Sequence, residues 1–368
     1  MIKKHHKWLS FSILSIFLAG CGLFSNQETT EPNPKPPTEE VIPEEDENEQ
    51  EEVKVNQDLQ AWLPRLDNVR YSYEGTGNEY ASYNWTPQFN QDNYYQTSTD
   101  NGGTTVAEIY DYNEHEVIRS FQRPETYFRD NFTEIGSFPD QREEEVILKT
   151  PIQVGNSWNS NGNDYEITAV DYEIEVPAGT YPTIEVTITM DDMMIKRYYA
   201  EDVGLVSEIS ETEGMTVESN LETIETQTPE VLPLTVYVPD EQAMGMDRVE
   251  AELTLNTNDP ARVAITQLLS GQVEPYKEIN ILSEGTEINY LFLNDENIVE
   301  VDMTSAFEKN MAGSTGELFA IYTLVNTLSD YYGTQEVLLT VEGEPYSGPH
   351  ATLEEGEVFT FNEEMINE

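Results

Sequence analysis

The sequence of 368 residues has few basic side chains, very little histidine and a single cysteine. Its 18 lysines and arginines stand against 71 aspartates and glutamates, which gives a formal net charge of −53. Nucleic acid is therefore not an expected partner, because such binding requires basic side chains that displace counterions from phosphates. One cysteine excludes an internal disulfide framework and cysteine-rich metal sites. Apolar residues still make up 38% of the chain, so a core can form, and the length favours two domains.

The scarcity of histidine and of nucleophile motifs argues against catalysis. Beyond the first 21 residues only His115 and His350 remain, and both stand in polar or turn-forming surroundings typical of a surface. The sequence contains neither a Gly-x-Ser-x-Gly motif nor a phosphate-binding glycine loop with its lysine. We therefore expect a protein that is not an enzyme, with no catalytic residues, no cofactor and no metal site.

The N-terminal apolar run is too short to span a membrane. Lys3, Lys4 and Lys7 precede apolar residues 9–20, a pattern typical of a secretory signal. A run of about twelve residues cannot cross a hydrocarbon core that needs roughly 20. The run ends in Leu18-Ala19-Gly20-Cys21, which resembles the lipobox of bacterial lipoproteins.

The lipobox resemblance implies cleavage between Gly20 and Cys21 and a diacylglyceryl group on the Cys21 sulfur. Two acyl chains hold a protein on a membrane stably, whereas one chain binds only marginally. Residues 1–21 are accordingly assigned to a lipoprotein signal peptide. The mature protein is expected on the outer face of the bacterial cell membrane, anchored through Cys21. An ordinary signal peptide with an incidental cysteine, or a buried helix, is the alternative.

Residues 22–56 form a segment rich in glutamate and proline. Its 11 acidic residues and two lysines give it a charge of −9. Such a composition cannot bury enough apolar surface to offset the entropy of ordering, so the sequence predicts a disordered acidic tether. The tether acts either as a spacer or as a passive solubilising stalk. With the +3 of the signal also removed, residues 57–368 carry −47, which suggests a saline or alkaline habitat.

Residues 57–226 show the alternating pattern of β-strands and little helical periodicity. Val69, Tyr71 and Tyr73 are one example, and Asn101-Gly102 and Asn161-Gly162 are strong hairpin signals. The expected fold is an all-β antiparallel sheet domain, either a sandwich or a partial barrel. Residues 154–158, 176–181 and 198–206 resemble a recurrent β-rich domain of bacterial surface lipoproteins, and this resemblance implies a fold type more than an activity.

Nine tyrosines lie between Tyr71 and Tyr127, and Trp85 lies among them. They favour two readings: a surface on which carbohydrate stacks, or simply the preference of aromatic residues for strands and half-buried sheet faces. A group of polar oxygens over residues 159–166 suggests calcium at first sight. Its spacing does not fit a calcium-binding loop, and a hairpin turn explains it better.

Residues 230–350 alternate between strand and helix patterns. Strands are expected over residues 232–238, 248–255, 278–282, 287–293, 299–303 and 336–341. One helix is expected from Pro260 to Leu269, with Asn258 or Asp259 as its N-cap. A second runs to Tyr332 from a capping box formed by Ser314 and Glu317. The order predicts a small α+β domain with two helices on one face of a sheet.

Several stretches of this region resemble the GerM-type domain of sporulation and spore-germination proteins. They are residues 232–234, 267–271, 284–286, 301–304 with Phe307, 313–317, 325–328 and 337–343. The resemblance implies a non-enzymatic module, similar to ring-building modules, that contacts envelope proteins. The chain departs from the sporulation protein in having one such domain instead of two in tandem. Asn326 and Thr327 could face either a partner or the sheet, and we favour a structural role for both.

The sequence therefore predicts a lipid-anchored adaptor or scaffold of the cell envelope, ending in an acidic tail over residues 351–368. A link to sporulation or germination complexes follows only from the GerM-type resemblance. The alternative function is a surface receptor that binds wall glycan or a small molecule through the tyrosine-rich β domain.

Overall fold

The computed structural model describes residues 54–134, 144–309 and 313–367. Leu18, Ala19, Gly20 and Cys21, with the signal peptide and nearly all of the tether, lie outside the described residues. The residues from Val53 onward form one compact unit. Within the described part of the chain, no helix is both long enough and apolar enough to cross a membrane.

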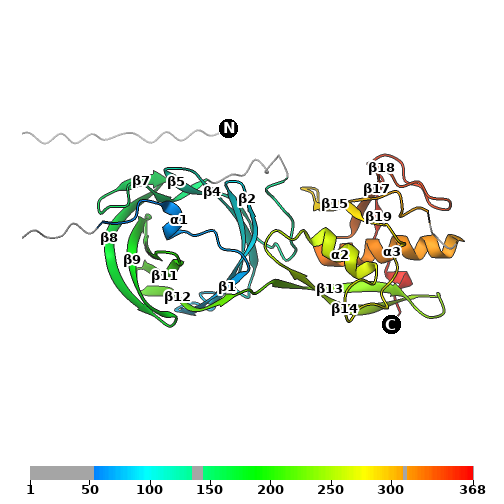
Figure 1. The fold of residues 1–368 in the computed structure, drawn as a ribbon, viewed down its shortest axis with the longest axis horizontal. Helices are drawn as coiled ribbons and strands as arrows, with labels where there is room; N and C mark the ends of the chain where they lie inside the picture. The colour runs from blue at the N-terminus through cyan, green and yellow to red at the C-terminus, as the bar shows by residue number, and fades with distance from the viewer. Residues whose placement is uncertain (1–53, 135–143, 310–312, 368) are drawn as a thin grey trace, which may run out of the picture. The chain divides into compact units, whose positions relative to one another are not determined.

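A twelve-stranded antiparallel sheet makes up the first part of the fold. Its strands follow the order β6-β5-β4-β3-β2-β1-β12-β11-β10-β9-β8-β7, so most neighbours in the sheet are neighbours in the sequence. Figure 1 shows the strands curving around a common interior. The elements are α1 (Leu59–Trp62), β1 (Val69–Thr76), β2 (Tyr83–Gln91), β3 (Tyr94–Asp100), β4 (Thr105–Tyr112), β5 (Glu116–Arg123), β6 (Glu145–Lys149), β7 (Ser157–Ser160), β8 (Asn163–Val176), β9 (Gly179–Thr189), β10 (Met193–Ala200), β11 (Gly204–Thr212) and β12 (Met215–Thr226).

The two edge strands, β6 and β7, are joined through side chains. The backbone N–H of Val146 donates to Ser160 Oγ at 2.8 Å, and the indole N–H of Trp158 donates to the Val146 carbonyl at 2.8 Å. These bonds occupy backbone groups that an open edge would leave unpaired. The sheet is one continuous and nearly closed structure, which agrees with the expected partial barrel and not with a sandwich of two sheets.

A β-bulge at Ser120 decides which side chains of β5 face the interior. Tyr110 pairs with Arg119 and Ile109 pairs with Phe121, so Ser120 is an extra residue on its strand. Cross-strand partners share a face of the sheet. The bulge therefore turns Arg119 inward beside Tyr110, while Phe121 faces outward with Ile109.

The outward face of β3–β5 packs against the second part of the fold. Ile109, Phe121, Phe128 and Phe132 belong to the same buried cluster as the apolar residues of that part. The charged side chain of Arg129 is buried at this contact. Arg129 forms an ion pair with Glu230 at 2.9 Å, and its Nη2 donates to the carbonyls of Gln88 and Asn256.

The second part contains two sheets with a long helix between them, rather than the single small sheet expected. Helix α3 packs against β13 on one side and against β16 and β17 on the other, as Figure 1 also shows. In the larger sheet β16 and β17 are parallel and the remaining pairs are antiparallel. The elements are β13 (Glu230–Pro239), β14 (Met246–Leu255), α2 (Ala261–Leu269), β15 (Ile288–Leu293), β16 (Ile298–Met303), α3 (Gly313–Tyr332), β17 (Glu336–Val341), β18 (Glu344–Pro345), β19 (Phe359–Thr360) and the 3-10 helix η1 (Glu363–Met365).

Two local predictions in this part are wrong. Residues 278–282 form no strand; Asn280 makes only an isolated bridge to Ser270. Helix α2 begins at Ala261, with Pro260 in extended conformation at the N-cap and no side-chain cap. The Asp259 carboxylate is already occupied, because it accepts hydrogen bonds from the backbone and side chain of Asn256.

The predicted capping box of α3 is also absent. Ser314 lies inside the helix, and Glu317 is buried with its carboxylate turned away from the helix start. Its Oε1 accepts hydrogen bonds from the Tyr346 hydroxyl at 2.9 Å and from the backbone N–H groups of His350 and Ala351 at 3.2 Å. Glu317 therefore secures the loop after β18 instead of capping its own helix.

The buried polar residues of α3 serve the fold. Asn326 exchanges hydrogen bonds with the backbone of Asn362, and Thr327 Oγ1 accepts from the backbone N–H of Tyr237. The preference for a structural role of Asn326 and Thr327 is confirmed. The bond from Asn326 also holds the C-terminal residues, where β19 adds to β17 and Ile366 bridges to Met246.

The two hairpin signals have different outcomes. Asn161 and Gly162 both have positive φ, 51° and 80°, as the favoured two-residue turn between β7 and β8 requires. At the other signal only Gly102 has positive φ, and the loop is longer. Asn101 Oδ1 there accepts from the N–H groups of Gly103 and Thr104.

Candidate functional site

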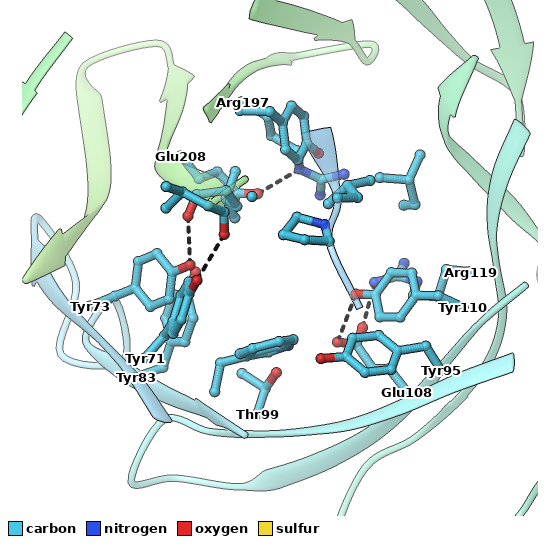
Figure 2. A pocket seen from close by; sticks show the side chains of 18 of the residues that line it. Tyr71, Tyr73, Tyr83, Tyr95, Thr99, Glu108, Tyr110, Arg119, Arg197 and Glu208 are labelled. Carbon is cyan, nitrogen blue, oxygen red and sulfur yellow. Dashed lines mark hydrogen bonds and ion pairs between the residues drawn. The ribbon is translucent and has the colours of Figure 1, made fainter. Parts of the chain in front are cut away.

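The interior of the twelve-stranded sheet contains a cavity of about 300 Å³. Figure 2 shows the side chains of its walls pointing toward this space from several strands. The lining residues are Leu63, Pro64, Tyr71, Tyr73, Tyr83, Trp85, Tyr95, Thr99, Glu108, Tyr110, Tyr112, Arg119, Ile147, Arg197, Tyr199, Val203, Gly204, Leu205 and Glu208.

Aromatic rings from alternating strand positions form much of the wall. Residues two apart on a strand face the same side of a sheet, and this places pairs such as Tyr71 and Tyr73 inside together. The Trp85 ring lies 5.3 Å from the Tyr71 ring and 6.1 Å from the Tyr95 ring, measured between centroids. The rings of Tyr73 and Tyr83 stack at 4.3 Å. The result is a continuous aromatic wall.

The tyrosine hydroxyls differ in how they are bonded. Tyr71 donates to the Val203 carbonyl at 2.9 Å and Tyr73 donates to the Leu205 carbonyl at 2.7 Å. Burial, with a smaller contribution from Tyr181, raises the pKa of Tyr71 to about 12, so its hydroxyl stays protonated at neutral pH. Among the described residues, the Tyr112 hydroxyl and the Trp85 indole N–H have no hydrogen-bond partner, so both remain available to a ligand.

A chain of ion pairs crosses one side of the cavity. Arg119 contacts Glu108 at 2.8 Å and also Glu145. Arg197 contacts Glu145 at 3.2 Å and Glu208 at 2.7 Å. Glu145 thus joins β5 to β10 through two guanidinium groups, and three carboxylates share two arginines.

The protonation states of this network follow from its contacts. Burial alone would raise the pKa of Glu145, but the guanidinium groups of Arg197 and Arg119 and the Tyr165 hydroxyl outweigh it and lower that pKa. Burial would lower the pKa of Arg197, yet Glu208, Tyr199 and Glu145 raise it well above its ordinary value. Glu145 is therefore ionised and Arg197 is protonated near neutral pH.

The tyrosine-rich sheet expected from the sequence is only partly a single surface. Six of the nine tyrosines line the cavity, whereas Tyr80, Tyr94 and Tyr127 do not. Tyr80 and Tyr127 are about half exposed. The charged members Arg119, Arg197, Glu108 and Glu208 were missed. Of these four, Glu108 had a signal in the sequence, because it alternates with Tyr110 and Tyr112 on one strand.

The remaining sequence candidates lie elsewhere. His115 and His350 are exposed residues in separate parts of the fold, and the structure does not bring them together. Asn159 donates to Asp164 across the hairpin between β7 and β8. Among residues 54–134, 144–309 and 313–367, no three His, Cys, Asp or Glu side chains are grouped so as to hold a metal ion.

Three solved structures have limited similarity to this chain. A candidate lipoprotein from Clostridium perfringens is 15% identical, and the match covers 35% of this chain and 87% of that one, with a TM-score of 0.23. A candidate exported protein with a YmcC-like fold from Bacteroides fragilis is 10% identical, covering 44% and 98%, with a TM-score of 0.23. A candidate lipoprotein from Parabacteroides distasonis is 10% identical, covering 44% and 97%, with a TM-score of 0.25. TM-scores this low do not establish a shared fold.

No curated protein matches the chain. A family match is found in the second part of the fold and covers less than half of the sequence. It spans most of the region in which the GerM-type resemblance was expected, and it supports that expectation. Residues 235–347 match the family described as Germane, sporulation and spore germination, and so form a Germane-type domain.

Proposed function

We propose that this chain is an extracytoplasmic receptor, anchored by lipid, that holds a small molecule inside its twelve-stranded sheet. The observation that carries the proposal is the cavity of about 300 Å³. Ligand sites of small molecules are concave and mostly apolar, with a few polar groups that fix orientation. The aromatic wall with its ion pairs and unpaired donors has this composition. This proposal takes up the alternative function expected from the sequence, with the cavity as its support.

The receptor function can be tested by a substitution that fills the cavity with a larger side chain. We expect Thr99→Trp to occupy the space beside Trp85, whereas Thr223→Trp adds the same side chain at an exposed position of β12. The full chain would be heated with a library of amino acids, amines, sugars and nucleosides. Compounds that bind in the cavity should raise the melting temperature of the wild type and of Thr223→Trp, but not of Thr99→Trp. No shift with any compound, or shifts that persist in Thr99→Trp, would refute the proposal.

The proposed location rests on the N-terminal sequence. Lys3, Lys4 and Lys7, the apolar run and the lipobox ending at Cys21 support export and lipidation. A Cys21→Ala chain should not incorporate labelled fatty acid and should not remain with the cell membrane. Its retention on cells with normal processing would contradict the anchor.

A second candidate function is that of an envelope adaptor, which the Germane match favours. In this case the domain formed by β13–β19 contacts other envelope proteins, without catalysis, and a role in sporulation or germination complexes is included in the proposal. Met244, 86% exposed in the turn between β13 and β14, is a suitable site for a photo-crosslinking residue. Specific protein adducts should form there and not from exposed Tyr172 on β8. Equal or absent adducts at the two sites would count against the adaptor.

A further inference from the structure

We infer that the cavity selects a small organic cation with a methylated ammonium group, which lies against Trp85 and near Glu208. The inference rests on the proposed receptor function and adds the chemical class of the ligand. Three features lead to it: an ion-pair network beside the cavity with one carboxylate in excess, the aromatic nature of the cavity wall, and one carboxylate with an oxygen left free.

The charged residues that line the cavity balance, but the ion-pair network that they form with Glu145, which is not a lining residue, has one more carboxylate than guanidinium groups. Arg119 is bound between Glu108 and Glu145, and Arg197 is bound between Glu145 and Glu208, which leaves one negative charge in excess. The whole chain adds a strongly negative field with its net charge of −53. Because both guanidinium groups are already paired, an anionic ligand would find no free cation and would be repelled.

The aromatic wall suits a cation that needs no hydrogen bonds. Eight aromatic side chains line the space, and the face of an aromatic ring carries negative electrostatic potential that attracts ammonium groups. Tryptophan is the strongest of these partners, and Trp85 lies centrally between Tyr71 and Tyr95. A primary ammonium would require three acceptors, whereas a methylated one makes its main contacts with rings. Aromatic cages are the common solution for such ligands.

Glu208 is the carboxylate placed to neutralise the ligand. Its side chain is 31% exposed, compared with 10% for Glu108 and 9% for Glu145. Oε2 of Glu208 accepts from Arg197 Nε at 2.7 Å, and Oε1 has no partner within the described part of the chain. Figure 2 shows Glu208 at the wall of the cavity, across the open space from Tyr110 and Arg119.

An uncharged sugar fits these contacts less well. Sugar hydroxyls require several donors and acceptors, but the Tyr71 and Tyr73 hydroxyls donate to backbone carbonyls. Both guanidinium groups are also engaged in ion pairs, each with two carboxylates. A buried hydroxyl left without a partner costs binding free energy. The volume of about 300 Å³ also limits the part of any ligand inside the cavity to the size of a small molecule.

The test compares two molecules of the same shape. Choline and its uncharged isostere 3,3-dimethylbutan-1-ol would be titrated by calorimetry into the full chain, held in phosphatidylglycerol nanodiscs that contain no choline. We expect choline to bind at least about 10-fold more tightly than the alcohol, since the cation–π and carboxylate contacts require the charge. Glu208→Gln should weaken choline binding by about 10-fold, while Glu211→Gln, an exposed change on the same strand, should not.

The outcomes separate this inference from the receptor function. Equal binding of choline and the alcohol, or tighter binding of N-acetylglucosamine, would contradict the inference that the ligand is a cation. The proposed receptor function would then still stand. Absence of binding by choline, together with no cavity-dependent ligand in the library, would overturn both. The comparison of the two isosteres uses the unmodified chain, so it decides the point even if Glu208→Gln fails to fold.

Discussion

At the scale of single residues, buried charge is used to fix loops. Glu317 projects from α3 and gathers one hydroxyl and two backbone N–H groups on Oε1. The loop approaches so closely that a Cβ at Gly348 would overlap both Glu317 and the Tyr346 ring. The spacing of Ser314 and Glu317 predicted a capping box. That prediction was wrong because local spacing contains no information about the Tyr346 hydroxyl, 29 residues away, to which Glu317 binds instead.

Replacing Glu317 should therefore destabilise the second part of the fold. Glu317→Ala leaves two part-buried N–H groups and one buried hydroxyl without their acceptor, and we expect the free energy of unfolding to fall by about 2–3 kcal/mol. Glu317→Gln keeps an acceptor oxygen and should cost less. Chemical denaturation measures both, with exposed Glu344→Ala as a control expected within about 0.5 kcal/mol of wild type. A Glu317→Ala chain as stable as the control would contradict this role.

At the scale of elements, the alternation in the sequence predicted where the strands lie better than it predicted which side chains face the interior. The tyrosines of β1, β2 and β4 share the interior because a regular strand alternates its sides. Arg119 and Phe121 are two apart and would share a face in a regular strand, yet the bulge at Ser120 separates them. Tertiary pairing creates this bulge, and no short motif marks it. The position of Arg119 in the cavity wall was therefore not predictable from the pattern of its own strand.

Another element-scale feature is Asp130, which joins three separate segments. Oδ1 accepts from the Tyr332 hydroxyl of α3 at 2.7 Å, and Oδ2 accepts from the backbone N–H of Leu293 in β15 at 3.1 Å. Burial raises the pKa of Asp130 to about 7, although these two hydrogen bonds and nearby Arg123 act in the opposite direction. The folded state thus binds this proton more tightly than the unfolded state, whose aspartate has an ordinary pKa near 4.

The pH dependence of stability follows from this difference. The stabilisation from the Asp130 proton is complete below about pH 4 and is lost as the pH rises toward 7. Asp130→Asn removes this titration. Between pH 5 and 8 the free energy of unfolding of the wild type should therefore fall by about 2–3 kcal/mol more than that of the variant. Urea unfolding across this range measures the difference, and exposed Asp171→Asn is the matched control. Parallel pH profiles of wild type and Asp130→Asn would rule the effect out.

At the scale of the whole molecule, three of the few basic residues are used inside the fold. Arg119, Arg129 and Arg197 all form ion pairs with largely buried side chains. The internal use of arginine leaves the surface carboxylates of a chain with a charge of −53 still less compensated. Repulsion among them opposes the compact state, and salt screens it, since the Debye length falls from about 30 Å at 0.01 M to about 3 Å at 1 M.

The melting temperature should therefore rise with salt. We expect an increase of roughly 5 °C between 0.01 M and 1 M NaCl, and a comparable rise at lower concentrations of CaCl2 because a divalent cation screens more strongly. The effect should weaken near pH 4.5, where many carboxylates begin to take up protons and the repulsion falls. Calorimetry at both pH values tests the cause as well as the size. If neither salt raises the melting temperature at neutral pH, the acidic surface does not limit stability and is no sign of a saline or alkaline habitat.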